Sequence, residues 1–494
     1  MKKILASILL VSLLQSCGRE SMSEINTDPN SYYTTVPSTL VTYAEKQLTD
    51  YVTTPNVNVN NFRLTMQYWQ ETTYLDESRY DFSTRNVSNN VWLYLYVRTI
   101  KNLDQAKKLI NDYQPTASEA ATWPKTMKNQ LAIIDLLQVY SYQILVDTYG
   151  DVPYTEAGDI DAHPLPKYDS GKDIYASLIA RTKQSLANFD STGLTFGSGE
   201  KIYYVAPTSS CGPACAAAQE VSKWKKFGNS LLLKLAMGIA DSDPALAQAT
   251  AQAAISGGVY TSASDSALFQ YLTSPNYSQL YTNLVASNRN DFVAGKTIVD
   301  KMNASADPRR TAYFQLRNGA YVGGAIGVNS PFGSYSAPGA FAYAQTTPCI
   351  LLNYTEVAFY LAEASARWGI GGAPATNYAN AVTASFLQWG KTAADATAYL
   401  ATHPYDATNW KKSIGEEAWI AMYDQPTQSF NFWRRLDFPV LQPAANAVSE
   451  ANNKVPVRLK YPVTEQSTNP TNYGAASTAI GGDELFTKIF WDKN

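Results

Sequence analysis

The strongest constraint on the fold is the recurrence of apolar residues at three- and four-residue spacing over most of the chain. Segment 88–112 carries Trp92, Leu95, Leu103 and Ile110 in this pattern, which is typical of one buried face of an α-helix. The same pattern recurs in segments 37–52, 118–149, 169–189, 221–241, 350–369 and 374–389. Several neighbours are joined by short turns. The sequence therefore predicts a mainly α-helical fold with little β-structure, built from helix–turn–helix pairs.

Turn residues indicate where some of these helices begin and end. Asp243-Pro244 is a capping residue followed by proline in the first turn, which predicts a helix start. Gly257-Gly258 predicts the end of that helix. Pro124 should either kink the helix 118–149 or restart it. A strand-like run is expected at 201–205, a short helix at 291–302, and an irregular tail at 456–494.

The predicted pairs are concentrated at about 37–260 and 350–437, and a loop-rich insert of about 261–349 lies between them. Loops this long are usually functional or disordered in compact domains. Aromatic residues continue through the insert, which argues against disorder. The pairing resembles that of tetratricopeptide repeats, although no strict consensus recurs at their period of roughly 34 residues.

The first residues predict export. Lys2 and Lys3 precede an apolar run at 4–14 that is too short to span a bilayer, and this order is that of a secretory signal. Ser16 directly before Cys17 fits a lipoprotein cleavage site, and Gln15 fits it less well. We expect a signal peptide at 1–16, a lipidated tether at 17–30 and a single domain at 31–494. An ordinary secretion signal with a chance cysteine is the alternative.

Composition excludes several classes of protein. A net charge of −3 and the lack of any basic cluster argue against nucleic-acid binding. The two histidines, His163 and His403, are too few for a multi-histidine metal site, and each precedes proline. Tyrosine is abundant, with 34 residues against 17 phenylalanines and 10 tryptophans. Tyrosine rings combine an apolar face with a hydroxyl, which suits ligands of mixed polarity.

The remaining cysteines allow two readings. Cys211 and Cys215 lie in a turn-rich segment and form either a local disulfide or two free thiols. Cys349 is expected to be buried at the entry to a helix. No second cysteine pair is present for zinc. A structural calcium ion is conceivable, but no calcium-loop motif occurs, so no metal site or cofactor is predicted.

Several short stretches, taken in order over nearly the full chain, resemble the SusD/RagB family of Bacteroidetes outer-membrane lipoproteins. After Cys17 these stretches are Asn26-Thr27-Asp28-Pro29-Asn30, Tyr168-Asp169-Ser170, Trp224 to Leu231, Asp307-Pro308-Arg309, Thr355 to Ala364, and Asn431 to Asp437.

The resemblance implies a fold, a location and a partner. Four tetratricopeptide-like pairs would support a ligand face built by loops. The protein would be anchored in the outer membrane, facing the cell exterior, as a lid over a SusC-like TonB-dependent barrel. It would deliver glycans to that barrel, or peptides in some branches of the family, and it would have no catalytic activity.

Glycan capture requires aromatic faces for the apolar side of a sugar and polar groups for its hydroxyls. The loops near 69–82, 277–291 and 321–343 supply both, and the resemblance is carried over to them by region only. Each candidate has an alternative role in ordering its own loop. The candidate ligand-binding residues are Trp69, Tyr74, Arg79, Asn288, Arg289, Tyr335 and Phe341.

Two other functions compete with glycan capture. An all-helical glycoside hydrolase would need two carboxylates across a cleft, and the pairs to consider are Glu71 with Asp76 and Asp147 with Asp151. The latter pair fits better as polar residues at a helix end. A structural lid with no ligand of its own is the third possibility.

Overall fold

The computed structural model describes residues 35–493, and the calls on the signal peptide, Cys17 and the tether lie outside that range. Helices make up 55% of the protein and strands 5%. This confirms the predicted mainly α-helical class with tetratricopeptide-like pairing. None of the helices within residues 35–493 is both long enough and apolar enough to cross a membrane.

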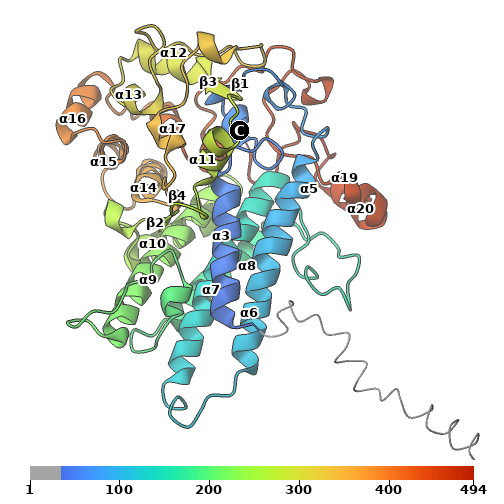
Figure 1. Ribbon diagram of the computed structural model, residues 1–494, viewed down its shortest axis with the longest axis vertical. Coiled ribbons are helices and arrows are strands. Elements are labelled where there is room, and N and C mark those ends of the chain that lie inside the picture. Colours follow the sequence, from blue (N-terminus) through green and yellow to red (C-terminus); the bar gives the residue numbers. More distant parts are fainter. Residues whose placement is uncertain (1–34, 494) are drawn as a thin grey trace, which may run out of the picture.

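The N-terminal helices pack as an antiparallel bundle, in which α7 contacts α8, α8 contacts α9, and α9 contacts α10 (Figure 1). A π-helix at Leu93–Ile100 joins α5 to α6 without a break. The helices of this part are α3 (Pro37–Thr53), α4 (Phe62–Thr65), α5 (Val87–Trp92), α6 (Lys101–Asp112), α7 (Trp123–Tyr149), α8 (Gly171–Asn188), α9 (Pro213–Gly238) and α10 (Pro244–Gly257).

The predicted helix boundaries follow from local capping. Pro124 lies in the first turn of α7, so proline restarts the helix there rather than kinking it. The Asp243 carboxylate accepts a hydrogen bond from the Leu246 backbone N–H at 3.2 Å and caps α10. Cys211 and Cys215 are joined by a disulfide at the start of α9.

The C-terminal helices form further pairs, α14 with α15 and α17 with α18. In Figure 1, α14, α15 and α17 lie above α9 and α10, and α14 contacts both of these helices. Gly369, with φ of 68°, ends α14 in the left-handed conformation that glycine adopts readily. The helices are α11 (Gln279–Tyr281), α12 (Lys296–Ala304), α13 (Arg310–Tyr313), α14 (Tyr354–Trp368), α15 (Pro374–Gln388), α16 (Ala393–Thr402), α17 (Trp410–Ala421), α18 (Pro426–Leu436), α19 (Val463–Thr468) and α20 (Pro470–Ala479).

Two small antiparallel sheets tie the insert to the rest of the chain. β1 (Trp69–Glu71) pairs with β3 (Phe292–Ala294), and β2 (Ala267–Phe269) pairs with β4 (Cys349–Leu352). The first pairing places the loop after β1 beside the segment before β3. Because these strands are far apart in the sequence, their pairing brings separate parts of the chain together.

Several local predictions are wrong. Residues 201–205 form no strand, because the Glu200 carboxylate accepts the Tyr203 backbone N–H at 2.8 Å and turns the chain. The helix expected at 291–302 is β3 followed by α12, which begins at Lys296. The tail contains α19 and α20. Cys349 is buried as predicted, but in β4.

The insert shares a second hydrophobic core with segments on either side of it in the sequence, and it also has a buried ionic anchor. Phe62, Trp69, Ile298, Met302 and Trp419 pack in this second core. The anchor is the side chain of Arg309, which contacts Asp307, Ser385 and Glu417 and so joins the insert to α15 and α17.

Candidate ligand-binding face

The loop after β1, residues 72–89, contributes side chains to two concave surfaces. Three contacts position it. The Thr72 backbone N–H donates to the Asp291 carbonyl at 2.8 Å, and the Ser78 N–H donates to the buried Glu71 carboxylate at 2.8 Å. The Arg79 Nε donates to the Gly327 carbonyl at 2.9 Å. The loop is therefore fixed against two parts of the insert, the segment before β3 and the segment at Gly327.

The first surface is a small hollow lined by Tyr74, Arg85, Arg289 and Asp291. Tyr74 is 63% exposed, although large aromatic residues are usually covered. Arg289 is also exposed, and its Nε lies 2.6 Å from Asp291 Oδ2. The hollow thus offers an open aromatic ring next to guanidinium and carboxylate groups, a combination that can cover an apolar face and hydrogen-bond its substituents.

A pair of buried acids supports the hollow from behind. Burial, together with the neighbouring charge of Glu71, raises the pKa of Glu77 to about 8. Burial also raises the pKa of Glu71. Arg85 Nε lies 2.6 Å from Glu77 Oε1. The fold therefore favours the protonated form of Glu77 near neutral pH, and Arg85 lies between Glu77 and the hollow that it lines.

This retained proton predicts a pH-dependent stability. Unfolded glutamate releases its proton near its ordinary pKa of 4.5. The folded protein binds more protons from there to about pH 8, so its stability falls as the pH rises through this window. Glu77→Gln removes this pH dependence. The free energy of unfolding of the variant, relative to that of the wild type, should therefore rise by about 1–2 kcal/mol between pH 5 and pH 8.5.

Urea unfolding at the two pH values measures this difference. Asp76→Asn is the matched control, because Asp76 is an exposed acid that also faces Arg85, at 3.6 Å. Its stability relative to the wild type should not change with pH. If the difference in free energy of unfolding between Glu77→Gln and the wild type is the same at both pH values, the result contradicts the raised pKa of Glu77.

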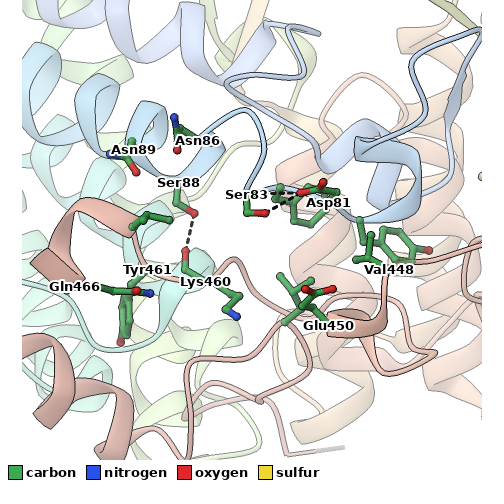
Figure 2. A pocket seen from close by; sticks show the side chains of 14 residues that line it. Asp81, Ser83, Asn86, Ser88, Asn89, Val448, Glu450, Lys460, Tyr461 and Gln466 are labelled. Atoms are coloured by element: carbon green, nitrogen blue, oxygen red, sulfur yellow. Dashed lines mark hydrogen bonds between the residues drawn. The ribbon is translucent and has the colours of Figure 1, made fainter.

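The second surface is a pocket of about 240 Å³ between the same loop and the C-terminal segment, and we call it the polar pocket after the polar side chains that line it beside apolar ones such as Phe82 and Val448 (Figure 2). Ser88 Oγ donates to the Lys460 carbonyl at 2.6 Å and joins its two sides. The polar side chains of the pocket that Figure 2 labels come from both segments, and they carry hydroxyl, amide, carboxylate and ammonium groups. They are Asp81, Ser83, Asn86, Ser88, Asn89, Glu450, Lys460 and Gln466.

Of the residues predicted from sequence, Tyr74 and Arg289 are brought together in the hollow. The prediction that Trp69 binds the ligand is wrong, because the structure buries this residue. Its side chain is 1% exposed, its Nε1 donates to the Tyr423 hydroxyl at 2.9 Å, and Arg63 covers its ring at 4.9 Å. Trp69 is a core residue that packs against Phe292 behind the hollow.

The other predicted residues lie elsewhere. Arg79 is half-buried and ties two loops together. Asn288 is an exposed turn residue with φ of 53°, and Tyr335 is half-buried after a short 3-10 helix; neither is among the residues that line the hollow. Phe341 lines a separate apolar groove together with Trp389.

Sequence reasoning missed Arg85 and the polar pocket. Arg85 lies between predicted elements and carries no signal of its own beyond its charge. The pocket depends on residues 448–466, which lie 372 positions from the loop at the Ser88–Lys460 contact and belong in part to the tail that is expected to be irregular. No local pattern could have joined these two segments.

The carboxylate pairs considered for hydrolysis are engaged in the fold. Asp147 is buried and accepts hydrogen bonds from the Tyr175 hydroxyl at 2.5 Å, Trp491 Nε1 at 2.9 Å and Asn431 at 2.7 Å. Asp151 accepts the Gly171 backbone N–H at 2.8 Å. Glu71 is buried beneath the loop. These contacts assign the acids structural roles.

Comparison with known proteins decides the family. A SusD-like family model described as starch-binding and associating with the outer membrane matches residues 29–462. The chain belongs to this SusD-like family. Proteins of the family are binding proteins rather than enzymes. No curated protein matches the sequence.

Solved structures agree with the fold of this SusD-like protein. A chitin-binding protein superimposes with a TM-score of 0.78 at 26% identity, covering 93% of this chain and 100% of its own. A chitin-binding SusD homologue from Flavobacterium johnsoniae gives 0.75 at 22% identity, covering 92% and 98%. A SusD homologue from Bacteroides thetaiotaomicron gives 0.75 at 21%, covering 93% and 100%.

The acidic and sulfur ligands of the described part do not gather for a metal. Within residues 35–493, no group of three or more histidine, cysteine, aspartate or glutamate residues could hold a metal ion.

Proposed function

We propose that this SusD-like protein captures glycans at the cell surface through the face formed by loop 72–89. The observation that carries the proposal is the exposed Tyr74 ring beside Arg85, Arg289 and Asp291. A sugar ring presents an apolar face and a rim of hydroxyls. Tyr74 would cover the apolar face, while the guanidinium and carboxylate groups would bind hydroxyls.

An extended glycan suits this face better than a monosaccharide does. The same loop supplies Tyr74 to the hollow and Asp81, Asn86 and Asn89 to the polar pocket. A chain of sugars would contact both surfaces in turn. The family description as starch-binding and the chitin-binding names of two structural relatives support glycan as the ligand class.

Native electrophoresis through gels that contain soluble starch or glycol chitin tests this function. Glycan binding predicts slower migration than in a gel without polysaccharide, for at least one of the two. Unchanged migration in both, together with binding of a peptide by calorimetry, would assign the protein to peptide uptake. Unchanged migration in both gels, without peptide binding, would assign the protein the function of a structural lid that has no ligand of its own.

We further propose that the captured glycan passes to a SusC-like TonB-dependent barrel in the outer membrane. Cys17 would carry the lipid that holds the protein beside this barrel, and residues 18–30 would leave slack for opening. Several acyl chains, each methylene contributing about 0.8 kcal/mol, suffice for stable anchoring.

Cys17→Ala should abolish membrane association in cells that lack the partner barrel, without loss of folding or of glycan binding. Sedimentation of membranes followed by immunoblotting measures this. Cys211→Ala is the matched control, since it removes a different cysteine and should leave the protein in the membrane pellet. Sedimentation of Cys17→Ala with membranes would contradict the lipid anchor.

A further inference from the structure

We propose that the apolar groove between β4 and the end of α15 is a second ligand site, which binds a phenolic ring. This site is separate from the proposed glycan face, with which it shares no lining residue. Its volume is about 520 Å³, which lies in the range of about 300–1,000 Å³ found for small-molecule sites.

The walls of the groove are apolar and aromatic. Leu268, Ile350 and Leu387 contribute aliphatic surface, and Phe341 and Trp389 contribute rings. The two rings meet edge to face, with centroids 5.1 Å apart and planes at 83°. Tyr313 packs against Trp389 from behind at 4.4 Å. The aromatic corner is therefore held in place by the core and is preformed for a flat ligand.

Leu387 marks the rim of the groove. It is 55% exposed at the end of α15, where burial in the fold does not explain an aliphatic side chain. An apolar ligand that enters between Leu387 and Trp389 would cover this side chain. Each buried methylene would then contribute about 0.8 kcal/mol.

One acceptor in the groove is left for a ligand. The Asp424 side chain is 8% exposed, and one of its oxygens accepts a hydrogen bond from Arg63 Nη2 at 2.8 Å. Its other oxygen has no hydrogen-bond partner among residues 35–493. An acceptor in a largely buried side chain gains from a donor that a ligand supplies. A hydroxyl of a ligand in the groove would satisfy it.

Several other polar groups of the groove are used by the fold, whereas Trp389 Nε1 is buried without a hydrogen-bond partner among residues 35–493. Asn353 accepts the Glu356 backbone N–H at 2.9 Å and donates to Gln388 at 3.0 Å. Ser266 Oγ accepts the Tyr354 backbone N–H at 3.0 Å. A sugar would bury many hydroxyls against apolar walls without enough partners. A ligand with one donor on an apolar body fits better.

The charge of the site favours a neutral donor. Arg63 already balances Asp424, so a ligand ammonium would gain little from a second opposite charge, while a hydroxyl would gain a charge-assisted hydrogen bond. An aromatic ring would pack against Trp389 and Phe341 in the arrangements that aromatic pairs prefer. A phenol combines both features, either free or as a substituent on a larger ligand.

Calorimetry on the full chain in detergent, with two matched neutral esters, tests this site. Methyl 4-hydroxybenzoate carries the donor and methyl 4-methoxybenzoate lacks it. We expect the hydroxyl ester to bind at least about tenfold more tightly, the loss expected when a buried acceptor goes unpaired. Leu387→Asp should weaken binding of the hydroxyl ester at least about fivefold, because it places a charge at an apolar rim. Tyr74→Ala should leave binding of this ester unchanged.

Other results would contradict the proposed phenolic site or restrict its range of ligands. Equal binding of the two esters would remove the role of Asp424, and binding unaffected by Leu387→Asp would place the ester elsewhere. Binding of N-acetylglucosamine that Leu387→Asp abolishes, without binding of either ester, would make the groove a sugar site instead. Asp424→Asn, if it folds, should reduce the preference for the hydroxyl ester, and the two preceding tests stand if it does not fold. A 4-hydroxybenzoyl sugar ester that competes with the free ester would show that the phenol is also accepted as a substituent, and failure to compete would restrict the site to free phenols.

Discussion

Replacing Arg309 by methionine should lower the free energy of unfolding by about 3–5 kcal/mol, because two buried carboxylates lose their common partner. Arg309 is fully buried, and its Nη2 lies 2.7 Å from Asp307 Oδ2 and 2.9 Å from Glu417 Oε2. Methionine fills much of the same space but donates no hydrogen bond. The insert would then lose its ionic anchor to α15 and α17.

Urea unfolding followed by circular dichroism measures this loss. Lys296→Met is the matched control: Lys296 pairs with Asp300 at 2.5 Å, and both side chains are exposed to solvent. Such surface pairs contribute about 0–1 kcal/mol. Equal destabilisation by the two substitutions would contradict the view that the buried anchor holds the insert to the helical pairs.

The second large effect is expected on binding. Tyr74→Ala should weaken binding of the best oligosaccharide by about 10–100-fold, equivalent to about 1.4–2.8 kcal/mol. Its ring is the open aromatic surface of the hollow. Because the ring is exposed, its removal should leave the fold intact.

Isothermal titration calorimetry with maltoheptaose and chitohexaose measures the affinities. Tyr43→Ala is the matched control, since Tyr43 is an exposed tyrosine on α3 and does not line the hollow. It should bind as the wild type does. Arg289→Ala should weaken binding as well, because it removes the guanidinium beside Tyr74. Wild-type affinity in Tyr74→Ala would exclude the ring from the site.

The helical scaffold could be predicted because its signals are local. Apolar spacing marked the long helices, and Pro124, Asp243 and Gly369 fixed several of their ends through backbone geometry. The strands could not be predicted in the same way. β1 and β3 are three residues each and pair across more than two hundred positions, and no periodicity develops over so short a run.

The motifs that carried the family resemblance turn out to hold the fold together. Asp307-Pro308-Arg309 forms the insert anchor, and Arg435 of the segment 431–437 pairs with Glu363 at 2.7 Å in the core. Such residues identify the architecture, because buried charges require specific partners. They carry no information about the ligand, because their side chains are buried in the fold.

The ligand face was predicted by region rather than by residue. Tyr68 and Trp69 are both buried, whereas Tyr74, five positions further, is open to solvent. Composition does not distinguish these rings, because their exposure is decided by the pairing of β1 with β3 and by Arg63 and Tyr423 beside Trp69. Arg289 is a candidate from sequence because amide and carboxylate residues stand close beside it, whereas Arg85 has no acidic residue next to it in the sequence.

Hydrogen exchange with saturating oligosaccharide tests the central claim most directly, since it reports where the glycan binds. We expect slower exchange of backbone amides in residues 72–89 and 287–291, with no change in residues 384–389 of the apolar groove. The same pattern should be absent in Tyr74→Ala. Protection confined to other parts of the chain, at a glycan concentration that saturates binding, would contradict the account.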